Sequence, residues 1–195
     1  MKALLVVIFA LLGSSSFCQL HLSAIFNDHM VLQRDKPIKI WGAAKAGDNV
    51  MVSMGEKKGS AIADKNGRWL ITMQAFQAGG PYVLTIKTKN ESKIYKDVLI
   101  GEVWLCSGQS NMQFRVRQAL NAKYEIHRAN NPLIRQLNIP NMLSFKPEEY
   151  IDSAQWILST PETTGDFTAV GFFFARDIYE KLHVPVGLIY DNWGG

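Results

Sequence analysis

A serine follows an apolar run in the second half of the chain. The segment Val103-Trp104-Leu105-Cys106 leads into Ser107-Gly108-Gln109-Ser110-Asn111-Met112. Small and polar residues after a buried strand predict a tight strand-to-helix turn, where free backbone N–H groups can stabilise an oxyanion. Ser110 is therefore a candidate nucleophile for acyl transfer. The spacing differs from the G-x-S-x-G elbow of α/β-hydrolases, because Met112 replaces the last glycine, and by itself it also fits a serine that merely caps a turn.

A second turn of the same kind ends the chain. The apolar residues 186–190 run into Asp191-Asn192-Trp193-Gly194-Gly195. In a parallel sheet, sites lie at the carboxyl ends of the strands. The turn at Ser110 and the turn at Gly194 and Gly195 are therefore expected at the same edge of one sheet.

The residues that would activate a serine are harder to find. Serine needs a base to take its proton, and the four histidines are His21, His29, His127 and His183. His183 precedes its strand and is expected on the opposite side of the sheet, while His127 has no aspartate three residues before it. Surface or structural roles are the prediction for all four.

Metal and cofactor chemistry have no support in the sequence. Cys106 lies in an apolar run without a neighbouring Cys/His pair, so its expected role is that of a small core residue. No phosphate-binding loop or dinucleotide fingerprint is present. We expect neither a metal nor a cofactor.

The elements that position Ser110 follow an α/β rhythm. Residues 98–106, 133–139 and 184–190 read as buried strands, and a helix is predicted from an Asp166 N-cap to Leu182. The apolar positions of this helix fall at intervals of three to four residues and are Val170, Phe173, Phe174, Ile178 and Leu182. Strand, helix and strand in this order predict a three-layer domain with a parallel sheet.

Residues 19–96 have a different pattern. Short strands with period-2 alternation are separated by turn residues, which is typical of an antiparallel sandwich or jelly roll. Asp64-Lys65-Asn66-Gly67 is predicted to be a hairpin turn and not a calcium loop. Trp41, Trp69 and Tyr82 could form a sugar-stacking surface, but aromatic residues on strand faces are more often part of the core.

Residues 1–18 resemble a secretory signal peptide, with Lys2 before an apolar run and small residues before Cys18. The run is too short to span a bilayer, so a secreted or periplasmic protein without a transmembrane segment is expected. Bulky Phe17 disfavours lipidation of Cys18. The net charge of +4 is not gathered into a basic stripe, which argues against a nucleic-acid partner.

The longer motifs carry a resemblance to a known family. The string Gly101-Glu102-Val103-Trp104-Leu105-Cys106-Ser107-Gly108-Gln109-Ser110-Asn111-Met112 closely resembles the nucleophile block of the sialate O-acetylesterase family, within the SGNH-type esterases. Ile25-Phe26-Asn27-Asp28-His29-Met30-Val31-Leu32-Gln33-Arg34, Gly79-Gly80-Pro81-Tyr82 and Asn192-Trp193-Gly194-Gly195 resemble further family blocks in the same order.

This resemblance implies a fold and a site. It implies a β-sandwich-like module over residues 19–96, followed over residues 97–195 by the first part of an SGNH-hydrolase-like α/β domain. Ser110 matches the nucleophile, and its backbone N–H with Gly194 or Gly195 matches the oxyanion hole. The family's later Asn or Gln donor and its Asp-x-x-His base have no counterpart here, so the chain is expected to be truncated and inactive alone.

The expected activity is removal of acetyl groups from an O-acetylated sugar. By resemblance the substrate is O-acetylated sialic acid, and acetylxylan-type polysaccharides are the alternative within the same chemistry. A non-catalytic carbohydrate-binding remnant is the alternative from another class of function.

Overall fold

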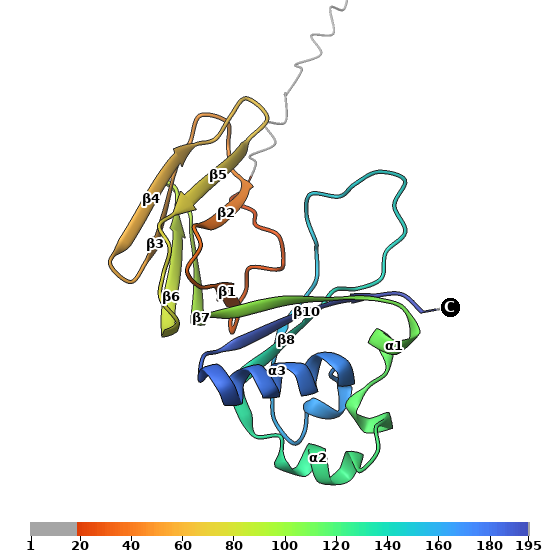
Figure 1. Ribbon diagram of the computed structural model, residues 1–195. Helices are drawn as coiled ribbons and strands as arrows, with labels where there is room; N and C mark the ends of the chain where they lie inside the picture. Colours follow the sequence, from red (N-terminus) through yellow and green to blue (C-terminus); the bar gives the residue numbers. More distant parts are fainter. Residues whose placement is uncertain (1–18, 195) are drawn as a thin grey trace, which may run out of the picture.

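The computed structural model describes residues 19–194 (Figure 1), so the predicted signal peptide and Gly195 lie outside the described residues. The strands are β1 (Val31–Gln33), β2 (Ile38–Ala43), β3 (Asn49–Met54), β4 (Lys57–Ile62), β5 (Arg68–Met73), β6 (Gly79–Lys87), β7 (Ser92–Gly108), β8 (Asn131–Asn138), β9 (Trp156–Ser159) and β10 (Val186–Asn192). The α-helices are α1 (Ser110–Gln113), α2 (Ala122–Arg128) and α3 (Ala169–Leu182), with 3-10 turns at Val116–Gln118 and Thr164–Asp166.

The N-terminal part is built mainly from antiparallel strands, as its alternation predicts, although β1 pairs parallel with β7. Strands β4, β3, β6 and β7 lie side by side, and β2 pairs with β5 in a separate two-stranded sheet. On β5 the residues Trp69, Ile71 and Met73 are buried and their neighbours are exposed. These side chains enter one core together with Leu84 and Ile86 of β6. Trp69 is therefore a core residue and not part of a sugar-stacking surface.

Strand β4 was not expected. Residues 55–59 read as a turn, but the turn takes only Gly55 and Glu56, and β4 begins at Lys57. This strand is at the edge of its sheet, and lysines with an exposed Ile62 mask its alternation. Exposed charge is a common protection of edge strands against further pairing.

One long strand joins the two halves. The first part of β7 pairs antiparallel with β6, and its second part pairs parallel with β10 over residues 102–108. The predicted boundary between residues 96 and 97 falls inside this strand, at Asp97, which has a φ of 53°. The result is an eight-stranded mixed sheet, which Figure 1 shows running through the whole molecule.

The C-terminal half of the sheet is parallel only in part. β10 lies between β7 and β8 and runs parallel to both, but β9 is antiparallel to β8. The prediction of a purely parallel sheet was therefore wrong at β9. Its short strand lies in a segment that reads as irregular, and it is fixed by Trp156, whose indole Nε1 donates to the Ile25 carbonyl at 3.0 Å.

The predicted helix begins later, and of its five expected apolar positions only Phe173 and Ile178 pack against the core. Asp166 is not its N-cap, because it ends a 3-10 turn, and Thr168 precedes the first helical residue Ala169. The buried positions of α3 are Ala169, Gly171, Phe172 and Ala175, whereas Val170, Phe174 and Leu182 are exposed. A Cβ on Gly171 would lie 2.9 Å from Cys106 Sγ. The helix presents its small residues to the sheet because they allow this close approach.

The second part of β7 is less covered than its apolar sequence predicts. Trp104 is 42% exposed and Leu105 is 65% exposed, since one side of this segment has no strand neighbour among the described residues. Trp104 packs edge-on against Phe174 of α3, with ring centroids 4.9 Å apart.

Within residues 19–194 no helix is long and apolar enough to cross a membrane.

Candidate active site

Ser110 lies at the carboxyl end of β7, as predicted, and its side chain is exposed. The strand ends at Gly108, whose φ of 139° is a conformation that residues with a Cβ rarely adopt. Ser110 then begins α1, which has 4 residues. A helix of a single turn has only a small macrodipole. The individual backbone N–H groups at Ser110 are therefore the groups that can stabilise negative charge at this site.

The turn is held in place from below by α3 and β8. The backbone N–H of Phe114 donates to the Ser110 carbonyl at 3.1 Å, and the Phe114 carbonyl accepts from Ala169 at 2.8 Å. The buried side chain of Gln136 on β8 accepts from the Thr168 backbone N–H at 3.1 Å. Sequence analysis missed Gln136 and Thr168, because only the fold brings them to the residues that follow Ser110.

The two predicted turns do meet. Asn192 is the register partner of Gly108, and the backbone N–H of Trp193 donates to the Gly108 carbonyl at 3.0 Å. A Cβ built on Gly194 would lie 3.7 Å from the Ser110 backbone nitrogen and would collide with Gln113 Oε1. The backbone of Gly194 therefore adjoins the N–H of Ser110. Gly195 lies outside the described residues.

The four histidines are all engaged or placed away from Ser110. His21 pairs with Ala43 as an isolated bridge, and His29 Nδ1 is 2.7 Å from Asp97 Oδ2. His127 lies exposed on α2.

His183 follows the last residue of α3, before the amino end of β10. Among the described residues, no histidine lines the hollows that contain Ser110.

Asp97 is the most strongly held ionisable group near the centre of the molecule. Arg135 Nη2 lies 2.9 Å from Asp97 Oδ2, and the Arg135 side chain is only 3% exposed. Burial alone would raise the pKa of Asp97, but the hydrogen bonds from His29 and Arg135 outweigh it and hold the pKa below its usual value. This cluster ties β8 to the strand that carries Ser110, and we assign it a structural role.

Cys106 is not an alternative nucleophile. Its side chain is buried, and burial raises the pKa of the thiol to about 11. At neutral pH the group is therefore a thiol and not the reactive thiolate. Within residues 19–194, no group of three or more His, Cys, Asp or Glu side chains could hold a metal ion.

Three hollows surround the turn. Ser110 lines one of about 310 Å³ together with Ser107 and Gly108, and another of about 370 Å³ with Arg115 and Arg117. A third cavity, of about 450 Å³, extends from Ser107 and Gly108 under the connection between β8 and β9.

The fold is similar to that of a carbohydrate acetylesterase of known structure. The solved structure of a carbohydrate acetylesterase from Xanthomonas citri matches the chain with a TM-score of 0.87 and 35% sequence identity, covering 90% of this chain and 41% of that one. No protein-family model matches.

The chain belongs to the sialate O-acetylesterase family. The human sialate O-acetylesterase is 31% identical over an alignment of 194 positions, gaps included, that covers 89% of this chain and 37% of the human protein. The mouse sialate O-acetylesterase is 30% identical over an alignment of 213 positions that covers 98% of this chain and 39% of the mouse protein. The chain therefore spans about two fifths of the length of these relatives.

Proposed function

We propose that this chain belongs to a carbohydrate O-acetyl esterase in which Ser110 attacks the acetyl carbonyl. The observation that carries the proposal is the meeting of two glycine-bearing turns: Gly194 adjoins the backbone N–H of the exposed Ser110 at the carboxyl ends of β7 and β10. The N–H groups of Ser110 and of Gly194 or Gly195 would then bind the oxyanion. One such donor contributes on the order of 3–4 kcal/mol to the transition state.

In the proposed reaction, Ser110 Oγ bonds to the acetyl carbon while a base removes the hydroxyl proton. The carbonyl oxygen becomes the oxyanion of a tetrahedral intermediate. When this intermediate collapses, the bond to the sugar oxygen breaks, and the base returns its proton to that oxygen, so the sugar leaves as an alcohol. Water then hydrolyses the acetyl-Ser110 ester and releases acetate. Because no described histidine lies at Ser110, the base is proposed to come from sequence outside this chain, and the chain alone is proposed not to hydrolyse esters appreciably.

The finer assignments are also part of the proposal. O-acetylated sialic acid is the first candidate substrate, because the curated relatives are named for it. An acetylxylan-type polysaccharide is the second, since the structural neighbour is described only as a carbohydrate acetylesterase. Residues 19–96 would form a sandwich-like module and residues 97–195 the first part of an SGNH-type domain. The apolar start of the chain would direct export.

The test is a pair of serine variants in the protein expressed from the complete open reading frame that contains this sequence. Ser110→Ala should lower kcat for acetate release by about 10⁴-fold or more, as loss of a nucleophile does. Ser107→Ala is the matched control, because Ser107 is exposed three residues before Ser110 and lines one of the two hollows that Ser110 lines. Equal activity of the two variants would exclude Ser110 as the nucleophile.

The non-catalytic alternative predicts a different result. If the protein only binds carbohydrate, neither serine variant changes acetate release, because there is none above the uncatalysed rate. Comparison of O-acetylated sialic acid with acetylated xylan then decides the substrate for an active protein.

A further inference from the structure

The largest cavity beside Ser110 lies on the side of the sheet away from α3. It has a volume of about 450 Å³ and is roofed by residues 139–151 of the connection from β8 to β9. Figure 1 shows this connection as a wide loop standing clear of the sheet, beside the carboxyl ends of β7 and β10. Ser107 and Gly108 line both this cavity and the hollow of Ser110. A molecule in the cavity therefore reaches the turn that carries the nucleophile.

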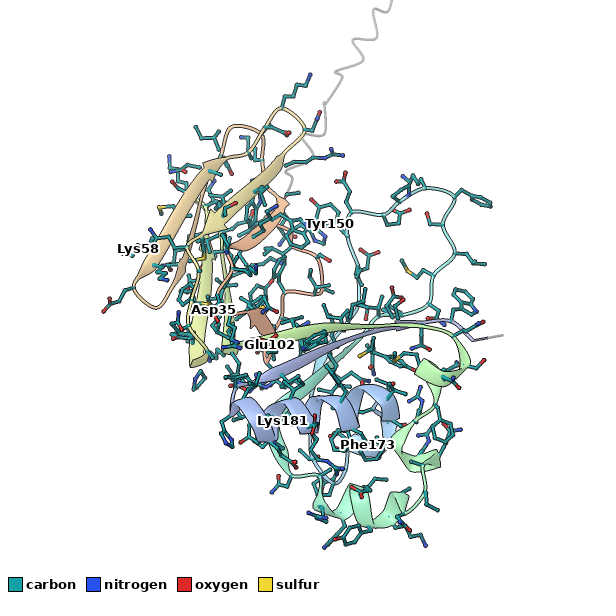
Figure 2. The ribbon with its side chains drawn as sticks, viewed as in Figure 1. Asp35, Lys58, Glu102, Tyr150, Phe173 and Lys181 are labelled. Carbon is teal, nitrogen blue, oxygen red and sulfur yellow. The ribbon has the colours of Figure 1, made fainter. Side chains whose placement is uncertain are left out.

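The connection is anchored where it returns to the N-terminal part. Tyr150, labelled in Figure 2, lies with its ring centroid 5.0 Å from that of His21, and the backbone N–H of Ile151 donates to Ser23 Oγ at 3.0 Å. The cavity thus has a wall that is fixed to the N-terminal part and a floor that belongs to the C-terminal sheet.

The lining combines two aromatic side chains, Trp193 and Tyr150, with several hydrogen-bonding groups. Trp193 lines the cavity and is 51% exposed, so its indole has surface available for packing. Asn141, Ser144 and Asp191 add polar atoms around it. A pyranose ring has a C–H face that packs on an aromatic ring and a rim of hydroxyls that need donors and acceptors. The lining matches both requirements.

Asn192 adds an independent observation. Its side chain is 6% exposed and lines the cavity, and its Nδ2 has no hydrogen-bond partner among the described residues. A buried donor without a partner costs about 1–3 kcal/mol, and buried amides in folded proteins are usually satisfied. The Nδ2 atom is itself buried, so a bound molecule would accept from it only after the Asn192 side chain turns toward the cavity.

We propose that this cavity binds the pyranose ring that carries the acetyl ester, with Trp193 packed against the ring and the Asn192 side chain turning to donate to one of its oxygens. The inference rests on the proposed function, which supplies the acetyl ester, but the binding of the sugar ring in this cavity is a separate claim. Lys146, Glu148 and Asp191 are the charged side chains of the lining. A carboxylate on the sugar would pair with Lys146, whereas an uncharged sugar would use only the neutral groups.

The test measures binding to the Ser110→Ala variant of the protein expressed from the complete open reading frame, which cannot form the acetyl intermediate. The probes are the methyl glycoside of 9-O-acetylated sialic acid and an acetylated xylo-oligosaccharide, titrated by calorimetry and by saturation-transfer NMR. Trp193→Ala should weaken binding of the preferred sugar by about tenfold, because it removes the flat apolar face on which the sugar ring packs. Trp104→Ala is the matched control, because Trp104 is 42% exposed but packs against α3, outside the cavity.

Two further variants make the test independent of one substitution. Asn141→Trp places bulk in the cavity from an exposed loop residue and should abolish binding without lowering the unfolding midpoint. Lys146→Met should weaken only the carboxylate-bearing sugar, so it distinguishes the two substrates. Sugar binding that Trp193→Ala and Asn141→Trp leave unchanged would overturn the inference, and so would absence of binding of either sugar.

The outcomes separate this inference from the proposed function. Acetate release that requires Ser110 but is insensitive to Trp193 and Asn141 would uphold the function and overturn the sugar site. Sugar binding that requires Trp193 in a protein without Ser110-dependent hydrolysis would uphold the sugar site and overturn the function.

Discussion

Replacing Asp97 with asparagine removes a charge from the cluster that joins the two halves of the sheet. Asparagine keeps the shape of the side chain and tolerates the φ of 53° at this position. The change leaves the Arg135 guanidinium, which is 3% exposed, without its counterion. Arg135 still donates to the carbonyls of His29 at 2.7 Å and of residue 97 at 2.6 Å.

The expected loss of stability lies between that of a buried and an exposed pair. Removing one partner of a fully buried pair costs about 3–5 kcal/mol. Asp97 is 32% exposed and the backbone bonds of Arg135 remain, so we expect a loss of about 2 kcal/mol in the free energy of unfolding. The assay is urea unfolding, read as a lower midpoint at an unchanged m-value.

Asp166→Asn is the matched control. Asp166 also pairs with arginines, since its carboxylate lies 3.0 Å from Arg115 Nη1 and contacts Arg117, but it is 54% exposed. Exposed pairs contribute less than about 1 kcal/mol. If Asp97→Asn destabilises the protein no more than Asp166→Asn does, the Asp97 cluster does not join the two halves as argued.

The same variant has a defined dependence on pH. The hydrogen bonds from His29 and Arg135 outweigh burial and hold the pKa of Asp97 below its usual value, so the unfolded carboxyl binds protons more readily than the folded one. The stabilisation is complete above the ordinary carboxyl pKa and is lost as the pH falls through the lower, folded value. The gap between wild type and Asp97→Asn should therefore be full near pH ~7 and shrink below about pH 4.

Three further predictions concern the site and its support. Gly194→Ala should lower kcat of the complete protein by about 100-fold or more without lowering its unfolding midpoint, because the new Cβ would displace Gln113 beside the Ser110 N–H; unchanged kcat would contradict the oxyanion role. Gly171→Leu should cost about 1–3 kcal/mol of stability by urea unfolding, since even a Cβ there would lie 2.9 Å from Cys106 Sγ; a neutral result would contradict the close packing of α3. Burial raises the pKa of the Cys106 thiol to about 11, so a thiol reagent should modify it near pH ~8 only as the chain unfolds; fast modification of the native chain would contradict this.

The sequence predicts secondary structure best for elements whose buried residues form a regular apolar pattern. The alternating apolar residues of both β3 and β5 are buried as expected. They are Val50, Val52 and Met54 on β3, and Trp69, Ile71 and Met73 on β5. The parallel strands β8 and β10 fall where their apolar runs predict them. The turn after β7 is also where the sequence predicts it, because small residues follow the apolar run.

The remaining features depend on contacts between distant segments. The buried face of α3 contains Ala169, Gly171 and Ala175 beside Phe172, and a search for large apolar residues passes over the three small positions. β4 and β9 are edge strands of the eight-stranded sheet, and pairing with β3 and β8 completes them. The unpaired amide of Asn192 is visible only after β10 has been set beside β7. These features follow from tertiary packing, and local pattern carries little of that information.

The central claim is that Ser110 carries the acetyl group during turnover. The most direct measurement is acid quenching of the complete protein during deacetylation of its sugar ester, followed by mass spectrometry of the proteolytic peptide that contains Ser107 and Ser110. The account predicts an acetyl group on Ser110 that appears with substrate, disappears as substrate is consumed, and is absent from the Ser110→Ala protein. Steady acetate release with no acetyl group on this peptide, together with full activity of Ser110→Ala, would contradict it.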